Sequence, residues 1–501
     1  MRYLLIIFCL CLFQIKVGAQ SSFNVVDFGA IADGKTVNTA AMQKAIDAAN
    51  KKGGIVVVPK GVFLTGSIYL KSNVELNLQE GAVLLGSTSL KDYQKGRWYA
   101  LLLAKNEKNI SLTGKGIIDG QGAALAADVL RLVQEGSIID PLSHNRPDEK
   151  NRPQIIEFTS CDNIRIKDIT LKNAACWVEV YNKCSNLTID NLTVESTAYW
   201  NNDGMDIVDC DKVKISNCNI NSADDGICLK SSDPKELCQN VEITNCKLRT
   251  SASALKFGTP SQGGFKNIVA RGLYVYDNYR TAIALEMVDG GVLQDIRITD
   301  VIAKNSGGAL FIRLGQRKKE KDPGVVKNVY IGNIKAEVPL SKPDSGYAFE
   351  GHYKKGPHNA FPSVIAGLPG FTIDDITLEN IEIDFSGASG KEIAVLGLDK
   401  LKDIPEKEGD YPEYSMFGEL PAWGFYIRHA SGIKMKNVKL SYKEKDTRPA
   451  IVCDDVKGLD IDALTVKSMD ELPVIYLNNV KKDNLTNIIL PVKDKKAIIK
   501  N

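Results

Sequence analysis

The sequence of 501 residues contains 63 basic and 61 acidic side chains, and 44% of its residues are hydrophobic. Such a small net charge lacks the strongly basic balance of nucleic-acid-binding proteins, so nucleic acid is not an expected partner. The chain is longer than an ordinary single domain, but a solenoid grows by stacking repeats, so length alone does not fix the number of domains.

Residues 1–19 have the features of an export signal. Arg2 precedes an apolar run from Tyr3 to Phe13, and Val17-Gly18-Ala19 supplies the small residues that a signal peptidase recognises. We therefore expect a secreted or periplasmic protein whose mature chain is residues 20–501, folded as one domain. No stretch approaches the roughly 20 apolar residues of a membrane-spanning helix, so membrane insertion is not expected.

The first element expected after this signal is an amphipathic helix over residues 39–50. Met42, Ala45, Ile46 and Ala49 recur there at helical spacing. The segments that follow have the pattern of strands, and a helix in front of a strand solenoid can cover its open end. We expect this helix to cap the N-terminal end of the fold.

A short unit recurs along most of the chain, an apolar/polar alternation that is broken by Asn or Asp and then resumes. Residues 163–171, Asn-Ile-Arg-Ile-Lys-Asp-Ile-Thr-Leu, are one copy, and residues 186–194, Asn-Leu-Thr-Ile-Asp-Asn-Leu-Thr-Val, are another. The alternation predicts half-buried strands, and Asn, Asp and Gly supply tight corners. Further copies begin at Lys212, Asn240, Asn267, Gly291, Asn328, Thr372, Gly432, Gly458 and near Asp483.

The repeat has a spacing that predicts the architecture. Corresponding apolar positions are separated by 23, 26, 28 and 27 residues, and they are Ile164, Leu187, Val213, Val241 and Ile268. A coil of about 25 residues has room for three short strands, which would pair in parallel with the next coil about 4.8 Å away. No helix of ten or more residues is expected between the repeats, which argues against a βαβ arrangement. The sequence therefore predicts an all-β fold, a single parallel β-helix with an N-terminal helical cap.

Long insertions interrupt the repeat at residues 121–153, 340–371 and 402–424, and the last two are rich in Gly, Pro and aromatic residues. Loops of this length on a β-helix are expected to rim the binding groove, where ligands are selected. These insertions either leave the groove open at both ends or close it.

The cysteine count bears on how the fold is stabilised. Two of eleven cysteines, Cys9 and Cys11, lie in the export signal, and small residues do not precede them as a lipoprotein signal requires. Eight of the other nine fall between Cys161 and Cys246 without the spacing of a zinc site. Cysteines that recur about once per coil favour small stacked core residues. A disulfide framework is the alternative in an exported protein.

Two segments depart from the repeat, Trp200–Asp206 and Ser222–Gly226. They contain Asp203, Asp224 and Asp225, and the separations of 21 and 22 residues place the three carboxylates on neighbouring coils. Clustered carboxylates repel one another, so at least one stays protonated beside an ionised neighbour, as hydrolysis of a glycosidic bond requires. Ordinary Asp-Gly turns and a calcium site are the alternatives.

These segments resemble the signatures of glycoside hydrolase family 28, an Asn-Thr-Asp-Gly-x-Asp motif followed one coil later by a pair of Asp residues. The stretch from Asp27 to Ser72 also resembles the first coil of that family, so the resemblance runs from about Phe23 to Val480. It implies a right-handed, pectin lyase-like β-helix. It also implies inverting hydrolysis of pectic polysaccharides or oligosaccharides, without a metal or an organic cofactor, by an enzyme that we expect to be a monomer.

The resemblance also implies roles for individual residues. Asp224 is the expected general acid, while Asp203 and Asp225 hold and deprotonate the attacking water. Asn201 is expected to orient the site from the same coil and to contact substrate.

Two motifs of the polygalacturonases are missing. Ser253 stands where the histidine of a Gly-His-Gly motif is expected, and Ala282-Ile283-Ala284 stands where an Arg-x-Lys pair grips a galacturonate carboxylate. Lys256 and Arg280 are candidate replacements for that charge, and Glu286 is a candidate acceptor for sugar hydroxyls. Rhamnogalacturonan hydrolases of the family also lack the histidine, so we expect a pectic substrate other than plain polygalacturonate.

Two other functions remain open on the sequence alone. A polysaccharide lyase on the same fold would use calcium and a basic side chain, and a non-catalytic β-helix would only bind glycans. Trp177, Tyr199 and Trp200 lie near the carboxylates in sequence and could stack on sugar rings or pack in the core.

Overall fold

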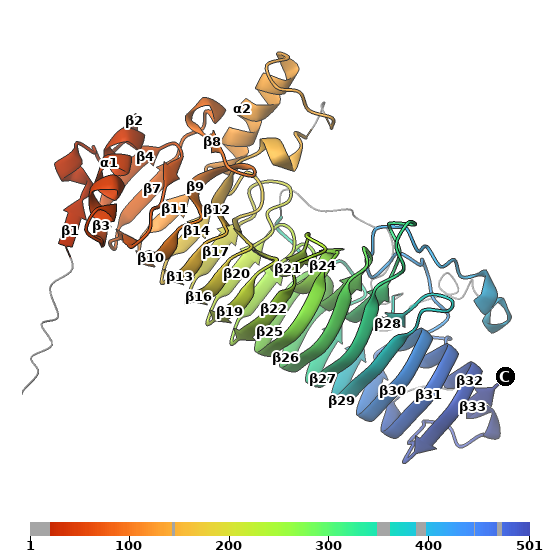
Figure 1. The fold of residues 1–501 in the computed structure, drawn as a ribbon. Helices are drawn as coiled ribbons and strands as arrows, with labels where there is room; N and C mark the ends of the chain where they lie inside the picture. Colours follow the sequence, from red (N-terminus) through yellow and green to blue (C-terminus); the bar gives the residue numbers. More distant parts are fainter. Residues whose placement is uncertain (1–20, 143–145, 348–360, 387–396, 445, 468–472) are drawn as a thin grey trace, which may run out of the picture.

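The computed structural model describes residues 21–142, 146–347, 361–386, 397–444, 446–467 and 473–501. Over these residues the chain winds into a parallel β-helix whose strand pairing is continuous from β1 to β33 (Figure 1). The predicted all-β architecture is therefore confirmed. No helix among the described residues is both long and apolar enough to cross a membrane.

In the N-terminal half each coil adds one strand to each of three parallel stacks. The first stack contains β1 (Ser21–Asn24), β3 (Gly54–Val58), β6 (Val74–Leu78), β10 (Lys108–Gly114), β13 (Asp162–Lys167), β16 (Ser185–Asp190), β19 (Asp211–Ser216) and β22 (Cys238–Thr244). The second contains β2 (Asp33–Val37), β4 (Gly61–Thr65), β7 (Ala82–Gly86), β11 (Ile117–Asp119), β14 (Thr170–Lys172), β17 (Thr193–Ser196), β20 (Asn219–Ser222) and β23 (Lys247–Thr250). The third contains β5 (Ile68–Tyr69), β9 (Tyr99–Lys105), β12 (Gln154–Thr159), β15 (Glu179–Asn182), β18 (Met205–Val208), β21 (Ile227–Ser231) and β24 (Leu255–Ser261), with β8 (Gln94–Lys95) antiparallel to β9.

In the C-terminal half most strands are longer and continue from one stack into the next, and only two of those described stay short. β25 pairs with β22, β23 and β24, so it extends all three stacks. These strands are β25 (Gly264–Met287), β26 (Val292–Leu314), β27 (Val325–Val338), β28 (Ser363–Ala366), β29 (Ile373–Phe385), β30 (Phe425–Tyr442), β31 (Ile451–Lys467), β32 (Ile475–Thr486) and β33 (Ile498–Lys500).

The register between coils follows the predicted repeat. Ile164 pairs with Leu187, Leu187 with Val213, Val213 with Val241, and Val241 with Ile268. Asparagines turn the corners in the left-handed conformation, which Asn tolerates better than most residues. Asn163 has φ 56° and donates from Nδ2 to Oδ1 of Asn109 on the preceding coil at 2.7 Å, so the corners are also tied to one another.

Apolar side chains that point inward from the three stacks form the core, and the cysteines belong to it. All nine cysteines of the described chain are buried and free. Cys184 and Cys210 lie on successive coils, with the Cys184 N–H 3.4 Å from Sγ of Cys210. The stacked-core interpretation is confirmed for these residues, and the disulfide framework is wrong.

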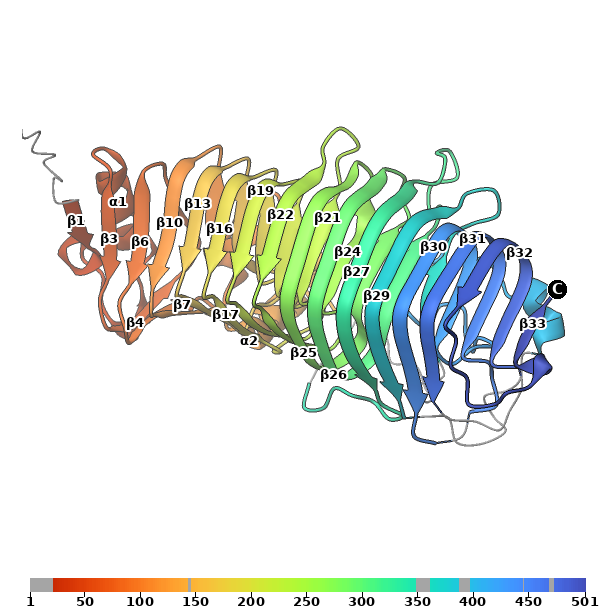
Figure 2. The same ribbon diagram turned by 90° about the horizontal axis from the view of Figure 1, so that it is seen from below.

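Helices lie outside the stacks. The predicted cap is α1 (Thr39–Asn50), whose buried side chains include Met42, Ala45, Ile46 and Ala49, and it packs against β1 and β3 at the N-terminal end (Figure 2). The insertion at 121–153 was expected as a loop, but it holds a second helix, α2 (Gly122–Gln134), which buries a stripe of Leu125, Ala126, Val129 and Leu132. Short 3-10 turns are η1 (Val25–Phe28), η2 (Leu90–Asp92), η3 (Glu149–Asn151), η5 (Leu398–Asp403) and η6 (Lys495–Ala497).

Candidate active site

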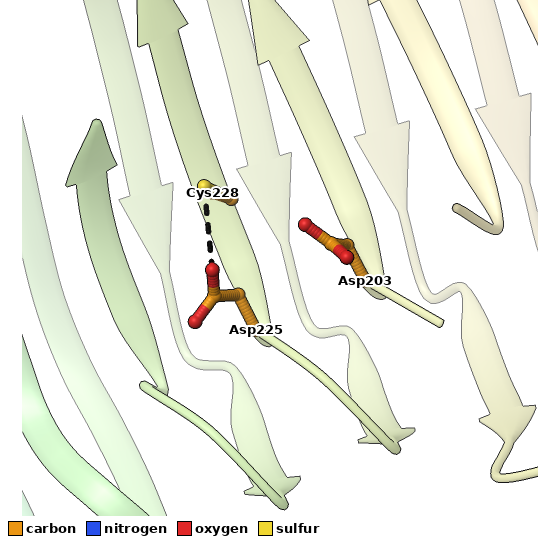
Figure 3. Close-up of side chains that lie close together, drawn as sticks. All are labelled: Asp203, Asp225 and Cys228. Carbon is orange, nitrogen blue, oxygen red and sulfur yellow. Dashed lines mark hydrogen bonds between the residues drawn. The ribbon is translucent and has the colours of Figure 1, made fainter. Parts of the chain in front are cut away.

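Two of the predicted catalytic aspartates occupy equivalent positions on neighbouring coils. β18 and β21 pair with Met205 opposite Ile227, so Asp203 and Asp225, each two residues earlier, lie side by side where these strands begin (Figure 3). A carboxylate oxygen of Asp203, one of Asp225 and Sγ of Cys228 all lie within 4.8 Å of one another. This spacing allows a single water to contact both carboxylates.

The turn that carries Asp224 and Asp225 is held by hydrogen bonds and close packing. Oγ of Ser222 donates to the backbone oxygens of Asp224 at 3.0 Å and Asp225 at 3.1 Å. A Cβ at Gly226 would lie 2.6 Å from the backbone oxygen of Ala254 on the next coil, so a larger residue would push the coils apart. Asp224 accepts the N–H of Asp225 on Oδ1 at 2.9 Å and is less buried than Asp203 or Asp225. Asp224 is therefore the carboxyl that a bound substrate reaches most easily.

Each carboxylate of the pair has its own buried lysine. Lys230 Nζ lies 2.9 Å from Oδ2 of Asp203 and also donates to Asp206. Lys256 Nζ lies 2.9 Å from Oδ2 of Asp225. Both lysines come from the third stack, Lys230 on β21 and Lys256 on β24, one coil beyond the carboxylates that they contact. Buried charges need such partners, because an unpaired one is costly.

The charges in this cluster separate the protonation states of the aspartates. Burial raises the pKa of Asp224 to about 7, and repulsion from Asp203 and Asp225 acts in the same direction. Burial also acts to raise the pKa of Asp225, but Lys256, Arg280 and Lys230 outweigh it, so that pKa lies below its usual value. Burial also raises the pKa of Asp203, to about 8, although Lys230 acts in the opposite direction. Near neutral pH the site therefore holds an ionised Asp225 beside Asp203 and Asp224, which are both at least partly protonated, and acid/base catalysis requires such a combination of a base and an acid.

The donor set around Asp203 and Asp225 does not suit a cation. Their oxygens already contact the ammonium groups of Lys230 and Lys256. The thiol of Cys228 donates to the backbone oxygen of Gly258 at 3.1 Å, and burial raises its pKa well above the usual value, so it stays protonated. A thiol ligates metals as the thiolate, and calcium prefers free oxygen ligands.

The same lysines are poor candidates for the base of a lyase. The nearby carboxylates overcome the effect of burial and raise the pKa values of Lys230 and Lys256 well above normal. A lysine that abstracts a proton must first be neutral, and these two remain charged. The site therefore favours hydrolysis over elimination.

Asn201 was predicted to orient the site and to contact substrate. Its side chain instead contacts Arg152, at the end of the insertion at 121–153. Oδ1 of Asn201 accepts from Nη2 of Arg152 at 2.7 Å. The buried Arg152 also donates to the backbone oxygens of Ala175 at 2.7 Å and Trp200 at 2.6 Å. These contacts tie the end of the insertion to the turn that carries Asp203.

The other predicted binding residues are buried and already paired. Lys256 also lies 3.6 Å from Glu286, and Arg280 lies 3.8 Å from Glu413. Burial raises the pKa of Glu286 to about 7. Ser253 lies one coil beyond Asp225 and donates its N–H to Oδ1 of that residue at 3.1 Å. The structure thus brings Lys256, Arg280 and Glu286 to the carboxylates, but as partners of protein charges.

Several residues at the site were not among the predicted site residues. Asp206 is the last residue of the Asn-x-Asp-Gly-x-Asp motif, so the sequence could have indicated that it lies at the site, where it contacts Lys230. Tyr411 accepts a hydrogen bond from Lys256 at 2.8 Å, and like Glu413 it belongs to an insertion without any repeat. Trp177, by contrast, was already expected either to stack on sugar rings or to pack in the core, and its ring centre lies 3.9 Å from Nζ of Lys230, which contacts Asp203.

Comparison with known proteins agrees with the fold and with the family resemblance of the sequence. The model of "Glycosyl hydrolases family 28" matches residues 49–252, which include all three aspartates, and that of "Right handed beta helix region" matches 178–333. The "Probable polygalacturonase" of Vitis vinifera is 27% identical over 385 residues, 72% of this chain and 70% of the relative. The "Exo-poly-alpha-D-galacturonosidase" of Dickeya chrysanthemi is 28% identical over 420 residues, 74% of this chain and 65% of the relative.

A solved structure supports the fold independently. The family 28 exopolygalacturonase of Yersinia enterocolitica superposes with a TM-score of 0.60 at 20% identity, over 93% of this chain and 78% of that one. The coils are accordingly those of a right-handed, pectin lyase-like β-helix. The matched region includes Asp203, Asp224 and Asp225, and over it this chain is similar to glycoside hydrolase family 28, with polygalacturonase-like relatives.

Proposed function

We propose that this enzyme hydrolyses α-glycosidic bonds in pectic polysaccharides or oligosaccharides, with inversion at the anomeric carbon. The observation that carries the proposal is that a carboxylate oxygen of Asp203 and one of Asp225 lie within 4.8 Å of each other, beside the more accessible and partly protonated Asp224. Relatives named as a polygalacturonase and an exo-poly-alpha-D-galacturonosidase support a galacturonate-containing substrate.

In the proposed mechanism Asp224 donates its proton to the leaving glycosidic oxygen. Asp203 and Asp225 hold a water against the opposite face of the sugar, and the ionised Asp225 accepts its proton as the C–O bond forms. The oxocarbenium-like transition state carries positive charge, which the carboxylates stabilise. Lys256 keeps Asp225 ionised, and Lys230 orients Asp203. Proton exchange with solvent then restores Asp224 and Asp225.

The pairing of the cations supports a substrate other than plain polygalacturonate. Lys256 contacts Asp225 and Glu286, and Arg280 lies near Glu413, so both cations already face protein carboxylates. A galacturonate carboxylate would have to compete with these partners. Rhamnogalacturonan and pectic oligosaccharides are therefore part of the proposed substrate range.

The proposal is tested by measuring reducing ends released from polygalacturonate, rhamnogalacturonan and their oligosaccharides by the wild type and by Asp224→Asn. We expect release from at least one substrate by the wild type, a large loss in the variant, and retained glycan binding. The anomeric form of the first product, followed by NMR, tests inversion. No release from any pectic substrate would overturn the proposal, as would a product with the ultraviolet absorbance of an unsaturated sugar.

Export and a monomeric state are also part of the proposal. The apolar run and small residues within residues 1–19, which lie outside the described residues, support cleavage near Gln20. N-terminal sequencing of the protein recovered from its host tests the cleavage, and sedimentation tests the oligomeric state. An intact N-terminus or a dimer would contradict the corresponding part.

A further inference from the structure

The segment of residues 397–424, called the strap below, crosses the outside of the third stack. It packs apolar side chains against outward-facing residues of β26, β28, β30, β31 and β32. On the strap these side chains are Leu401, Ile404, Tyr414, Met416, Phe417 and Leu420. On the stack they are Phe311, Val364, Ala366, Tyr426, Val452 and Tyr476. The strap is therefore fixed on the β-helix by burial of apolar surface.

Polar contacts anchor the middle of the strap at Glu406. The Glu406 carboxylate lies 2.9 Å from Nη2 of Arg428 and 3.1 Å from Nε2 of His429. Its backbone oxygen accepts from Nη2 of Arg313 at 2.5 Å. Nη1 of Arg428 also donates to the backbone oxygen of Ile404 at 2.9 Å. Three side chains from two coils thus converge on one short stretch of the strap.

Beyond this anchor the strap reaches the catalytic residues. Oη of Tyr411 accepts from Nζ of Lys256 at 2.8 Å, and the same ammonium lies 2.9 Å from Asp225. Nζ of Lys256 is 5.2 Å from the centre of the Tyr411 ring. Tyr411 is nevertheless 50% exposed, although its neighbours Lys256 and Asp225 are almost fully buried. The aromatic ring therefore presents a free surface directly beside the cleavage centre.

We infer that Tyr411 is a substrate-binding residue whose ring stacks on the sugar unit next to the bond that is cleaved, and that the Glu406 anchor positions it. This inference rests on the proposed function. The ligand is the apolar face of a pyranose ring, which suits an amphipathic aromatic with one polar edge fixed to the protein. The bond from Lys256 holds the ring in place, so little side-chain freedom is lost on binding.

Two variants at Tyr411 separate stacking from a role of the hydroxyl group. Tyr411→Ala should raise KM for the preferred pectic oligosaccharide about tenfold, the loss of roughly 1.4 kcal/mol of binding, with a much smaller change in kcat. Tyr411→Phe keeps the ring and should keep KM within about twofold of the wild type. An unchanged KM in Tyr411→Ala, or equal losses in both variants, would overturn the stacking role.

A third variant tests the anchor. Glu406→Gln removes the charge that Arg428 and His429 contact and should raise KM in the same direction as Tyr411→Ala. The double variant should show no further rise, because both changes remove one interaction. Glu408→Gln is the matched control, since its side chain is exposed and its bond to Gln316 uses the backbone oxygen.

The outcomes distinguish this inference from the proposed function. If the wild type hydrolyses no pectic substrate, the proposed function fails. If the wild type is active and the effects of Glu406→Gln and Tyr411→Ala on KM simply add, the positioning role fails while the function stands. Circular dichroism and thermal unfolding of every variant show whether a rise in KM reflects a local change or loss of the fold.

Discussion

The ammonium of Lys256 lies 2.9 Å from the carboxylate of Asp225, and both side chains are almost fully buried. This buried pair sets the protonation state of the proposed base. Without the cation, burial and the neighbouring carboxylates would favour a neutral Asp225, which could not accept a proton from water.

Lys256→Met should therefore lower kcat/KM near pH 7 by about 100-fold or more, an effect in the usual range for general base catalysis. The acidic limb of the pH profile should move to higher pH, because the pKa of Asp225 rises when its cation is removed. A profile of kcat/KM against pH measures both effects. Lys214→Met, at an exposed position, is the control and should match the wild type. An acidic limb that stays in place would show that Lys256 does not set the pKa of Asp225.

The raised pKa of Asp224, the proposed general acid, leads to a prediction about the alkaline side of the pH profile. Asp224 has a pKa raised to about 7, and a general acid must be protonated to act, so activity should fall as pH rises through about 7. Asp224→Asn should lower kcat on natural substrates by about 10²–10⁴-fold and remove this alkaline limb. Aryl glycosides with good leaving groups need little protonation, so their hydrolysis should suffer much less. Equal losses on both kinds of substrate would argue against Asp224 as the acid.

The sequence predicted the coils and the carboxylate pair because both depend on a local pattern repeated in register. Ile164, Leu187 and Val213 face the core at intervals of one coil, and their strands pair in parallel. The same parallel pairing between coils places Asp203 and Asp225 side by side. The sequence did not predict the role of Tyr411. The strap obeys no repeat, and its position depends on tertiary contacts to Arg313 and Arg428 that no spacing encodes.

Burial of charge was equally hard to foresee. Lys256 and Arg280 were predicted as candidate cations for a substrate carboxylate, but they are buried among protein carboxylates, and only their partners make this burial tolerable. The helix α2 was missed for another reason. Its apolar stripe lies inside an insertion, and the insertion was treated as a loop because it does not follow the strand repeat.

Arg152 should couple the insertion at 121–153 to catalysis. Replacement by Met would leave the backbone oxygens of Ala175 and Trp200 without their donor, at a cost of about 1–3 kcal/mol for a buried group. We expect a lower Tm and a reduced kcat, because the turn that carries Asp203 loses its support. Arg131→Met is the control, since the exposed Arg131 side chain pairs with Asp128 and Glu135 on α2 itself. A normal kcat with a lowered Tm would show that Arg152 contributes to the stability of the fold and not to catalysis.

The burial of the nine free cysteines leads to a prediction about how the protein responds to reductant and to thiol reagents. All nine are buried without a disulfide, so a reductant should leave Tm unchanged, and an alkylating reagent should label none of them rapidly in the native protein. After denaturation without reductant, mass spectrometry should show nine labelled thiols in the mature chain. A Tm that falls in reductant, or fewer than nine labels, would reveal disulfides. Because burial raises the pKa values of Cys184 and Cys228 well above normal, raising the pH to 9 should not accelerate native labelling at these positions.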